Sequence, residues 1–351
     1  MKSVLIVSKR QYGYHTDSYE LAKFLAREFD VHYFCFDAYQ ERIEGNGVNV
    51  IYVSSKGHYL IKALRFIRYA IKEVKKDYSF RFMVYFSFCS LVRLFSRKRV
   101  VLDIRTGSIQ ESKIQRKVDN WFRGFESIFF NRVTIISKGL REKLNIPVKK
   151  TYILPLGANS ISKVIKKFDY PRLFYIGTFY NRNIQDTIIG LSIFLKKFNH
   201  LKIDVSYDIV GSGSGSEILE LKKLVKRLNL EKNVVLHGRL NHNQARQFFD
   251  VCNVGISYVP LTTYFNHQPP TKTFEYILSG IACLATKTHE NERLIGKING
   301  ILHEDSPEGF ALGLEEIYSS FANYDSKVIA NSLPEYNWES IFKRFRTEFM
   351  G

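Results

Sequence analysis

The chain has 351 residues, of which 45% are apolar and 8 are Pro, so it is too long for one ordinary core and too apolar for disorder. We therefore expect two compact domains. The net charge of +18 lies mostly in residues 1–150, which hold 29 Lys and Arg against 14 Asp and Glu. This excess indicates an anionic partner, for which an anionic membrane and a nucleic acid are both open.

The cysteines and the apolar runs narrow the class further. The sequence has no C-x-x-C pair, and its separated cysteines are typical of a reduced protein without a disulfide framework or a zinc knuckle: Cys35, Cys89, Cys252 and Cys283. The apolar opening at 4–7 is followed at once by Lys9 and Arg10, unlike a signal peptide. The longest uncharged run, 82–92, is too short to cross a bilayer. We predict a cytoplasmic protein, either soluble or peripheral on the inner face of the plasma membrane.

The first half alternates short apolar runs with helical patterns, which predicts a mostly parallel sheet covered on both faces. A loop at 9–16 that contains Gly13 leads into a helix over 17–29, where Asp17 and Glu20 have capping-box spacing. The predicted strands are 2–8, 30–37, 48–54, 82–88, 99–105 and 133–137.

The segment 59–76 predicts an amphipathic helix with a basic face. Its predicted core-facing stripe is Leu60, Leu64, Ile67, Ile71 and Val74. The opposite face is either a solvated surface or a dock for anionic lipid or nucleic acid. Because the charge is so unevenly divided between the halves of the chain, we predict that this face meets a membrane through Lys62, Arg65, Lys72, Lys75 and Lys76.

The strand and helix pattern restarts after residue 169, which predicts a second α/β unit. Its strands are expected at 172–179, 203–211, 233–240, 254–260, 281–286 and 300–305. We predict a first domain over 1–160, a second over 161–333 and a terminal segment over 334–351. In that segment a helix carries an apolar stripe formed by Trp338, Ile341, Phe342, Phe345 and Phe349.

The segment 269–280 places Lys272 and Glu275 one helical turn apart at a predicted helix start. A cation and a carboxylate at a helix N-terminus suit a ligand with both phosphates and hydroxyls, because the lysine and the helix dipole favour anions. A nucleotide-sugar carries both groups. The alternative is an ordinary i, i+3 surface ion pair.

The run GSGSGS at 211–216 follows a predicted strand and precedes a predicted helix. Starting at Gly211, it either offers backbone N–H groups to an anion or forms a flexible turn. A dinucleotide site is disfavoured, because the next strand ends in His237 and Gly238 rather than in an acidic residue.

We expect phosphate charge to be met by side chains and helix ends rather than by a metal. The sequence has no D-x-D pair, no G-x-x-x-x-G-K-[ST] motif and no ligand spacing among its nine histidines. In the loop over 175–183, Gly177 leaves the strand end open, and Arg182 is either a phosphate ligand or a surface arginine.

In chain order the second half contains YIGTF, DIVGSGSG, VVLHGRL, CNVGISYVPL, a P-x-K-x-F-E-Y motif and NGILHED. This series resembles the C-terminal nucleotide-binding domain of glycosyltransferase family 4, closely over about residues 170–310. The first half is similar more loosely, through DIRTG, IISKGL and ILPLGAN. The resemblance implies an α/β GT-B fold of two facing Rossmann-like, doubly wound parallel-sheet domains, with a C-terminal helix that crosses back to the first domain.

The resemblance also implies roles in donor binding. Glu275 matches the second glutamate of the family's E-x7-E motif, which binds the ribose hydroxyls, and Lys272 matches a lysine that contacts the diphosphate. Gly177 matches the glycine beneath the phosphates, Arg182 lies near a phosphate-binding position, and Arg239 lies in the loop beside the nucleobase. The predicted donor-binding residues are Gly177, Arg182, Gly211, Arg239, Lys272 and Glu275.

One position departs from the family pattern. The first glutamate of E-x7-E would fall where this chain has His267. That position faces the transferred sugar in the family, and a histidine can still hydrogen-bond a sugar hydroxyl. In the first domain, we expect Gly13 to line the cleft and Asp103 and Arg105 to contact the acceptor or the sugar, unless the latter pair only pins its own loop. His267 and Asp103 are the candidate catalytic residues.

We therefore expect a metal-independent, retaining glycosyltransferase of bacterial surface polysaccharide biosynthesis, such as that of lipopolysaccharide. Its donor would be a nucleotide-diphosphate sugar carrying UDP or GDP, its acceptor a glycan or a lipid-linked glycan, and no further cofactor is expected. One alternative is a catalytically inactive homologue that binds a nucleotide-sugar or a glycan, which His267 motivates. Another is a nucleic-acid binder, although the basic half has no recognition motif with interleaved aromatics.

Overall fold

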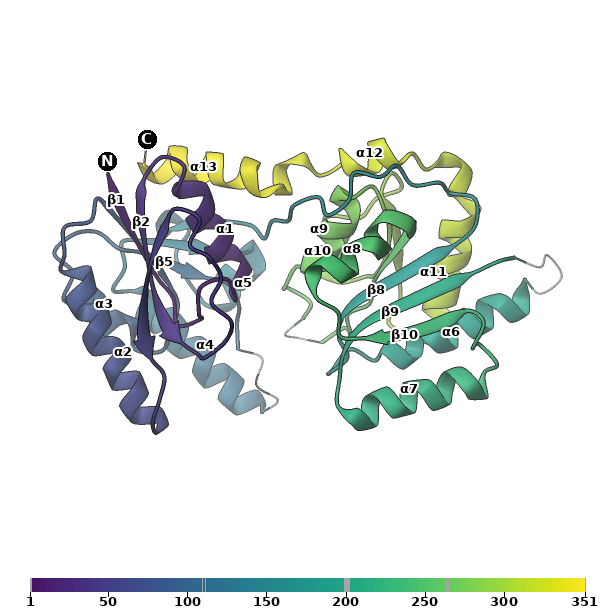
Figure 1. Cartoon of the computed structure of the whole chain (residues 1–351), viewed down its shortest axis with the longest axis horizontal. Helices are drawn as coiled ribbons and strands as arrows, with labels where there is room; N and C mark the ends of the chain where they lie inside the picture. The colour runs from purple at the N-terminus through teal and green to yellow at the C-terminus, as the bar shows by residue number, and fades with distance from the viewer. Residues whose placement is uncertain (1, 109, 111, 199–202, 263–264, 351) are drawn as a thin grey trace. The chain divides into compact units, whose positions relative to one another are not determined.

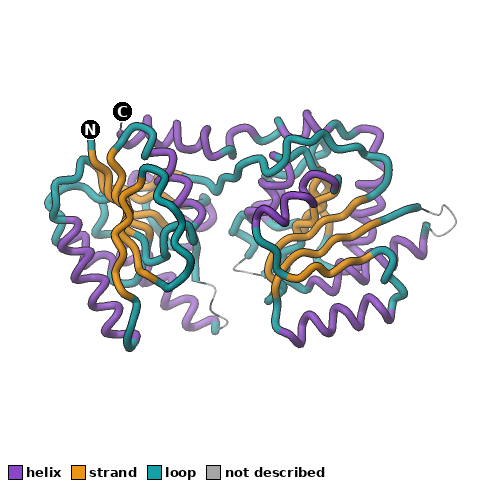
Figure 2. Tube along the Cα trace, viewed as in Figure 1, coloured by secondary structure: helices purple, strands orange, loops and turns teal. Residues whose placement is uncertain are grey.

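The computed structural model describes residues 2–108, 110, 112–198, 203–262 and 265–350. The chain divides into two compact units, which Figures 1 and 2 show with helices lying against the strands of each sheet. Unit 1 comprises Met1–Leu156 with Trp338–Gly351, and unit 2 comprises Gly157–Asn337. The sequence places these boundaries at 160 and 333.

Unit 1 contains a seven-stranded sheet in the order β3-β2-β1-β4-β5-β6-β7. The described strand pairs are parallel. Strand β1, which pairs with β2 and β4, is apolar and almost wholly buried, because helices cover both faces of such a sheet. The strands are β1 (Ser3–Val7), β2 (Asp30–Asp37), β3 (Val48–Ser54), β4 (Phe80–Val84), β5 (Val101–Ile104), β6 (Arg132–Ile135) and β7 (Thr151–Ile153).

The helices of unit 1 include the C-terminal one, α13, which Figure 1 shows in yellow beside α1. Phe24 of α1 and Phe342 of α13 have ring centroids 5.6 Å apart, and Arg27 pairs with Glu339 at 2.6 Å. Four members of the predicted apolar stripe, Trp338, Ile341, Phe342 and Phe345, are buried. The fifth, Phe349, is half-buried, with its ring centroid 4.8 Å from that of Phe345. The helices are α1 (Thr16–Leu25), α2 (Tyr59–Val74), α3 (Cys89–Leu94), α4 (Lys113–Ser127), α5 (Lys138–Lys143), α13 (Trp338–Met350) and a 3-10 turn, η1 (Val148–Lys150).

Unit 2 contains a six-stranded parallel sheet in the order β10-β9-β8-β11-β12-β13. Its strands are β8 (Arg172–Thr178), β9 (Ser206–Ser212), β10 (Val234–Gly238), β11 (Val254–Ser257), β12 (Ala282–Thr286) and β13 (Gly300–His303). Its helices are α6 (Ile184–Lys197), α7 (Gly215–Arg227), α8 (His242–Val251), α9 (Thr271–Leu278), α10 (His289–Glu292), α11 (Pro307–Ser319) and α12 (Ser326–Ala330), with 3-10 turns η3 (Phe321–Asn323) and η4 (Pro334–Tyr336). The four cysteines of the chain are buried free thiols, as predicted.

The start of α1 differs from the prediction. The N-cap is His15, whose Nδ1 accepts from the N–H of Ser18 at 3.4 Å, and Asp17 lies inside the first turn. The predicted capping box of Asp17 and Glu20 is therefore wrong. The Asp17 carboxylate instead pairs with Arg105 at 3.1 Å.

The buried face of α2 also differs from the prediction. Leu60 and Leu64 are exposed, and the buried positions are Phe66, Ala70, Glu73 and Val74. The ring of Phe66 fixes this rotation, because it packs among rings from neighbouring strands and loops. Its centroid lies 5.1 Å from that of Phe34, 4.5 Å from that of Phe36 and 5.2 Å from that of Phe86.

Candidate functional site

The strand order of unit 2 reverses between β8 and β11, and in open α/β sheets ligands bind at the carboxyl ends of the strands beside such a switch point. Four predicted residues lie on the segments that leave the sheet here. Gly177 belongs to β8 and Arg182 to the loop after it, while Lys272 and Glu275 lie on α9, after β11. The topology therefore brings residues from separate motifs to one edge.

Two glycines shape this edge in different ways. Gly177 and Gly211 are partners in the register of β8 and β9, and a Cβ on Gly211 would lie 2.0 Å from the carbonyl oxygen of Gly177. Gly211 is therefore required for the strands to pair. A Cβ on Gly177 would lie 2.9 Å from Oη of Tyr175, which donates to the carbonyl of Thr178 at 2.7 Å. Gly177 thus leaves room for a tyrosine that braces the strand end.

Helix α9 is tied to the end of β8 by a buried tyrosine. The N–H of Ile176 donates to Oη of Tyr276 at 3.1 Å, and the ring of Tyr276 occupies the space that a Cβ on Gly255 would need. Tyr276 adjoins Glu275 in the chain and Ile176 adjoins Gly177. The bond therefore holds α9, through the residue after Glu275, against the end of β8 that contains Gly177.

Lys272 and Glu275 form an ion pair, with Nζ and Oε2 separated by 2.5 Å. Their side chains are 35% and 15% exposed, so the pair is sheltered yet reachable by a ligand. The geometry agrees with the ion-pair alternative. It also places a cation and an acceptor together at the switch point, where an anion and a hydroxyl could each find a partner.

Arg182 is half-buried at the same edge. Its Cζ lies 3.9 Å from the ring centroid of Phe265, which belongs to the loop preceding α9. This cation–π contact holds the guanidinium against that loop. Burial raises the pKa of Tyr175, and the charge of Arg182 acts against that rise. Arg182 therefore lies within electrostatic reach of the tyrosine that braces Gly177.

His267 lies against α10. Its ring centroid is 4.9 Å from that of His289, and the side chain of Asn266 accepts from the N–H of His289 at 2.8 Å. His267, His289 and Glu290 place ligand atoms within 4.8 Å of one another, and two imidazoles with a carboxylate could hold a zinc-like ion. The sequence missed this group because its members are distant in the chain. Metal independence remains a prediction.

The remaining donor predictions lie farther along the same edge. Arg239 is exposed just after β10, which is separated from β8 by β9. In the glycine-rich loop, Ser214 and Glu217 form a capping box, in which the Ser214 N–H donates to the Glu217 carboxylate at 2.6 Å. The Ser214 N–H is therefore occupied by the helix cap of α7. This favours the interpretation of the loop as a turn over its interpretation as an anion site formed by backbone N–H groups.

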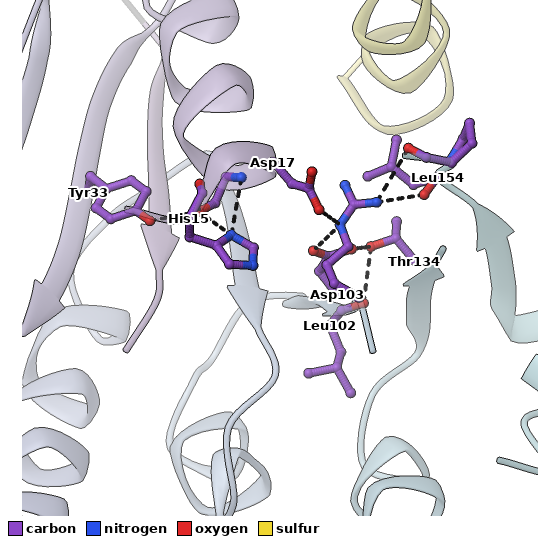
Figure 3. A network of polar contacts seen from close by, with 10 residues as sticks. His15, Asp17, Tyr33, Leu102, Asp103, Thr134 and Leu154 are labelled. Carbon is purple, nitrogen blue, oxygen red and sulfur yellow. Dashed lines mark hydrogen bonds and ion pairs between the residues drawn. The ribbon is translucent and has the colours of Figure 1, made fainter. Parts of the chain in front are cut away.

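Unit 1 contains a buried polar network around Asp103 and Arg105, which Figure 3 shows at close range. Nε of Arg105 lies 2.9 Å from Asp103 and 3.1 Å from Asp17, and Nη1 donates to the Leu154 carbonyl at 2.7 Å. The hydroxyl of Thr134 donates to the second Asp103 oxygen at 2.7 Å. The network thus links β5 to β6, to α1 and to the segment after β7.

The burial of this network bears on the two predicted roles. Asp103 is 1% exposed and the Arg105 side chain is 7% exposed. Burial raises the pKa of Asp103, with Arg105 and the Thr134 hydroxyl acting against it. Burial acts to lower the pKa of Arg105, but Asp103 and Asp17 outweigh it and raise that pKa. Both residues are enclosed by their own unit, which favours loop pinning over direct contact with an acceptor.

His15 is a candidate that the sequence analysis did not single out. Its Nδ1 lies 2.8 Å from the hydroxyl of Ser18, which in turn lies 2.7 Å from the Tyr33 hydroxyl (Figure 3). Burial lowers its pKa, which favours a neutral imidazole able to accept a proton. The signal in the sequence was a histidine in the loop after the first strand.

Gly13, in the same loop, packs under a neighbouring loop. It has a φ of +89°, and a Cβ there would lie 2.2 Å from Cδ1 of Ile43. The positive φ therefore favours glycine, and a larger residue would also have to displace the Ile43 side chain.

The five basic residues predicted to face a membrane lie on α2 or directly after it. Arg65 donates to the carbonyls of Ser54 and Lys56 at 3.1 and 3.0 Å, so it also anchors the end of β3. Lys76 pairs with Glu73 at 2.9 Å. Lys62, Lys72 and Lys75 lie over the rings of Tyr59, Tyr69 and Phe95. Within the described part of the chain, no helix is both long enough and apolar enough to cross a membrane.

No family model matches the sequence, and no curated protein matches it. Solved structures do match. The lipopolysaccharide outer core galactosyltransferase WaaB in its apo form is 13% identical, with a TM-score of 0.70 and coverage of 99% of this chain and 98% of that one. Sucrose-phosphate synthase from Thermosynechococcus elongatus is 14% identical, with a TM-score of 0.74 and coverage of 99% and 98%. Anabaena HepE in complex with UDP and glucose is 14% identical, with a TM-score of 0.72 and coverage of 99% of both chains.

These likenesses extend over nearly the whole chain and show the fold. With two parallel-sheet α/β units and a C-terminal helix that joins the first, the chain has the GT-B fold, and the predicted fold class is confirmed.

Proposed function

We propose that this protein is a glycosyltransferase that moves a sugar from a nucleotide-diphosphate sugar to an acceptor. The observation that carries the proposal is the Lys272–Glu275 pair, sheltered at the switch point of unit 2 and tied through Tyr276 to the end of β8. Lys272 and Arg182 would stabilise the diphosphate as its charge develops, and Glu275 would accept from the ribose hydroxyls. The solved complex of HepE with UDP and glucose, a protein of the same fold, supports this choice of donor.

The proposal extends to the stereochemistry, the carrier and the acceptor. We propose retaining and metal-independent transfer, with UDP or GDP as carrier, on the resemblance to family 4 and the missing D-x-D pair. A glycan or lipid-linked acceptor of surface polysaccharide at an anionic membrane suits the excess of basic residues in 1–150. WaaB, named as a lipopolysaccharide galactosyltransferase, supports the same pathway class.

Calorimetry with UDP, GDP and their sugars tests the donor site. Glu275→Ala should weaken binding by at least tenfold, because a charge-assisted bond is worth about 1.5–3 kcal/mol. A matched control is Glu220→Ala, which removes an exposed i, i+3 pair with Lys223 on α7 of the same unit. Equal affinity in Glu275→Ala and the wild type would remove the proposed site.

Turnover separates the enzyme from an inactive homologue, for which His267 at the sugar-facing position is the motivating residue. We expect nucleotide release from at least one donor in the presence of an acceptor glycan. Activity should survive EDTA, and its loss on chelation would assign a role to the group formed by His267, His289 and Glu290. Tight donor binding without release from any donor would favour the inactive homologue.

A further inference from the structure

Helix α4 presents an apolar stripe to solvent. Its members recur every three or four residues, and each is between 42% and 75% exposed: Ile114, Val118, Trp121, Phe125 and Ile128. The rings of Trp121 and Phe125 stack with centroids 5.6 Å apart and planes 12° from parallel. Scattered exposed apolar side chains are ordinary, but a contiguous row with two large rings marks an interaction surface.

A groove of about 570 Å³ runs beside the stripe, between α4 and the segment over residues 143–150. Trp121, Phe125 and Ile128 line one part of it, and Lys117, Lys143 and Lys150 line another. No acidic side chain occurs among the described residues that line it. The groove is therefore amphiphilic. Its apolar wall is continuous with the stripe, and the charged side chains that line it are all positive.

The local packing and electrostatics explain how this groove forms. A Cβ on Gly124 would lie 2.4 Å from the carbonyl oxygen of Leu144, so glycine lets α4 approach the chain after α5 closely. Burial lowers the pKa of Lys143, and the nearby charge of Arg116 lowers it further. An anion entering the groove would relieve this repulsion.

The same side of unit 1 carries further exposed apolar residues. Helix α3 packs beside both α2 and α4, and it exposes Leu91 and Leu94. The ring of Phe88, just before α3, lies 5.5 Å from that of Phe122 on α4. The basic residues of α2 and the stripe of α4 therefore belong to two helices that both contact α3.

We propose that the α4 stripe and its groove dock the protein on an anionic phospholipid leaflet, with the stripe at the acyl boundary and a lipid phosphate in the groove. Amphipathic helices with aromatic residues on one side and Lys or Arg on the other lie in membrane interfaces in this way. A second copy of the chain is a poorer occupant. An isologous contact would bring two copies of the lysine-lined groove into one interface without an acidic counterpart, and like charges across an interface are unfavourable.

This inference deepens the proposed function and rests on it, because it names the surface that would bring the enzyme to a lipid-linked acceptor. It also differs from the sequence prediction, which placed the membrane-facing surface on α2. On α2, Arg65 donates to backbone carbonyls and Lys72 lies over a ring, and Leu60 and Leu64 are exposed there too. Helix α4 differs in carrying two stacked aromatic rings, Trp121 and Phe125, beside a groove lined by lysines.

Trp121 is a native probe of this docking. The chain has two tryptophans, of which Trp338 is 4% exposed and Trp121 is 67% exposed. We would mix the full-length protein with vesicles of phosphatidylcholine, with or without phosphatidylglycerol, and with brominated acyl chains. The emission should shift to the blue and be quenched only with phosphatidylglycerol present. Trp121→Phe should retain vesicle binding in flotation while losing the quenching.

Flotation of variants with vesicles tests whether the residues of the stripe and the groove contribute to membrane binding. Lys117→Glu should reduce partition to anionic vesicles by fivefold or more, since one basic residue near such a surface contributes about fivefold. The double change Trp121→Ser with Phe125→Ser should reduce it further. The matched controls Lys222→Glu and Leu312→Ser alter exposed residues on helices of unit 2 and should leave partition unchanged.

Three outcomes would overturn the proposal. These are equal recovery with neutral and anionic vesicles, unchanged flotation of the double variant, and a stripe-dependent dimer in sedimentation without lipid, which would assign the surface to a second copy. Calorimetry with the nucleotide-sugar separates this failure from failure of the proposed function. If the wild type binds the nucleotide-sugar but not the vesicles, only the docking proposal is wrong. If the wild type does not bind the nucleotide-sugar, the proposed function is wrong.

Discussion

Removal of the Asp103 carboxylate distinguishes a structural role from a catalytic one. In Asp103→Ala, Arg105 loses a partner at 2.9 Å and the Thr134 hydroxyl loses its nearer acceptor at 2.7 Å, both in a buried site. The Leu102 carbonyl, 3.4 Å from that hydroxyl, remains. Breaking a buried ion pair by removing one partner costs about 3–5 kcal/mol. Asp17 remains 3.1 Å from Arg105 and compensates in part, so we expect a loss near the lower end, about 3 kcal/mol.

The assay is urea unfolding followed by tryptophan emission, which reports unit 1 because both tryptophans, Trp121 and Trp338, belong to it. Asp103→Asn is the milder companion, since it keeps the shape and loses the charge, and we expect it to cost about 1.5–3 kcal/mol. Donor binding in unit 2 should be unaffected by either change. If Asp103→Asn unfolds like the wild type but loses turnover, the carboxylate acts in catalysis and the structural argument is wrong.

Two further predictions concern unit 2. Gly211→Ala should cost about 1–3 kcal/mol of stability, because its Cβ would lie 2.0 Å from a backbone oxygen. Gly215→Ala is the control and should be neutral, because no atom lies within 4 Å of its Cβ. Equal melting temperatures of the two variants would contradict the role of Gly211 in strand packing. Burial lowers the pKa of His303 to about 4, so the unfolded chain takes up a proton near pH 6.5 that the native state refuses. Stability should therefore fall between pH 6.5 and pH 4 by up to about 1.4 kcal/mol per pH unit. Hydrogen exchange of β13 should show this slope in the wild type and a shallower one in His303→Gln, and an equal slope would assign the acid sensitivity to other groups.

Strand β7, Thr151–Ile153, was not predicted, because it is three residues long and only half-buried. The other strands could be predicted because they are short apolar runs that parallel pairing largely buries. The orientation of α2 could not be, since its sequence carries two apolar stripes at helical spacing. Phe66 decides between them through Phe34, Phe36 and Phe86, whose positions depend on the tertiary fold. Periodicity predicted a helix with an apolar side, and only packing against distant residues shows which side is covered.

The candidate site divides in the same way. The pairing of Lys272 with Glu275 could be predicted from the sequence, because the two residues are three positions apart on one helix. The glycine-containing loops could also be predicted, because each follows a predicted strand. The hydrogen bond from Ile176 to Tyr276, which joins two motifs into one edge, is a long-range contact without a local signature. The contact between His267 and His289 could not be predicted either, because it also joins residues that are distant in the chain.

The closed Lys272–Glu275 pair bears on which ligands the proposed donor site would accept. A partly exposed ion pair contributes only about 0–1 kcal/mol, so opening it is cheap compared with the roughly 1.5–3 kcal/mol of each charge-assisted bond that a diphosphate could form. An anion alone would take Lys272 and leave the Glu275 carboxylate, 15% exposed, without its cation. A ligand that also offers hydroxyl donors satisfies both groups at once. The pair therefore favours a nucleotide over free phosphate, because the sheltered carboxylate must regain a partner before the exchange becomes favourable.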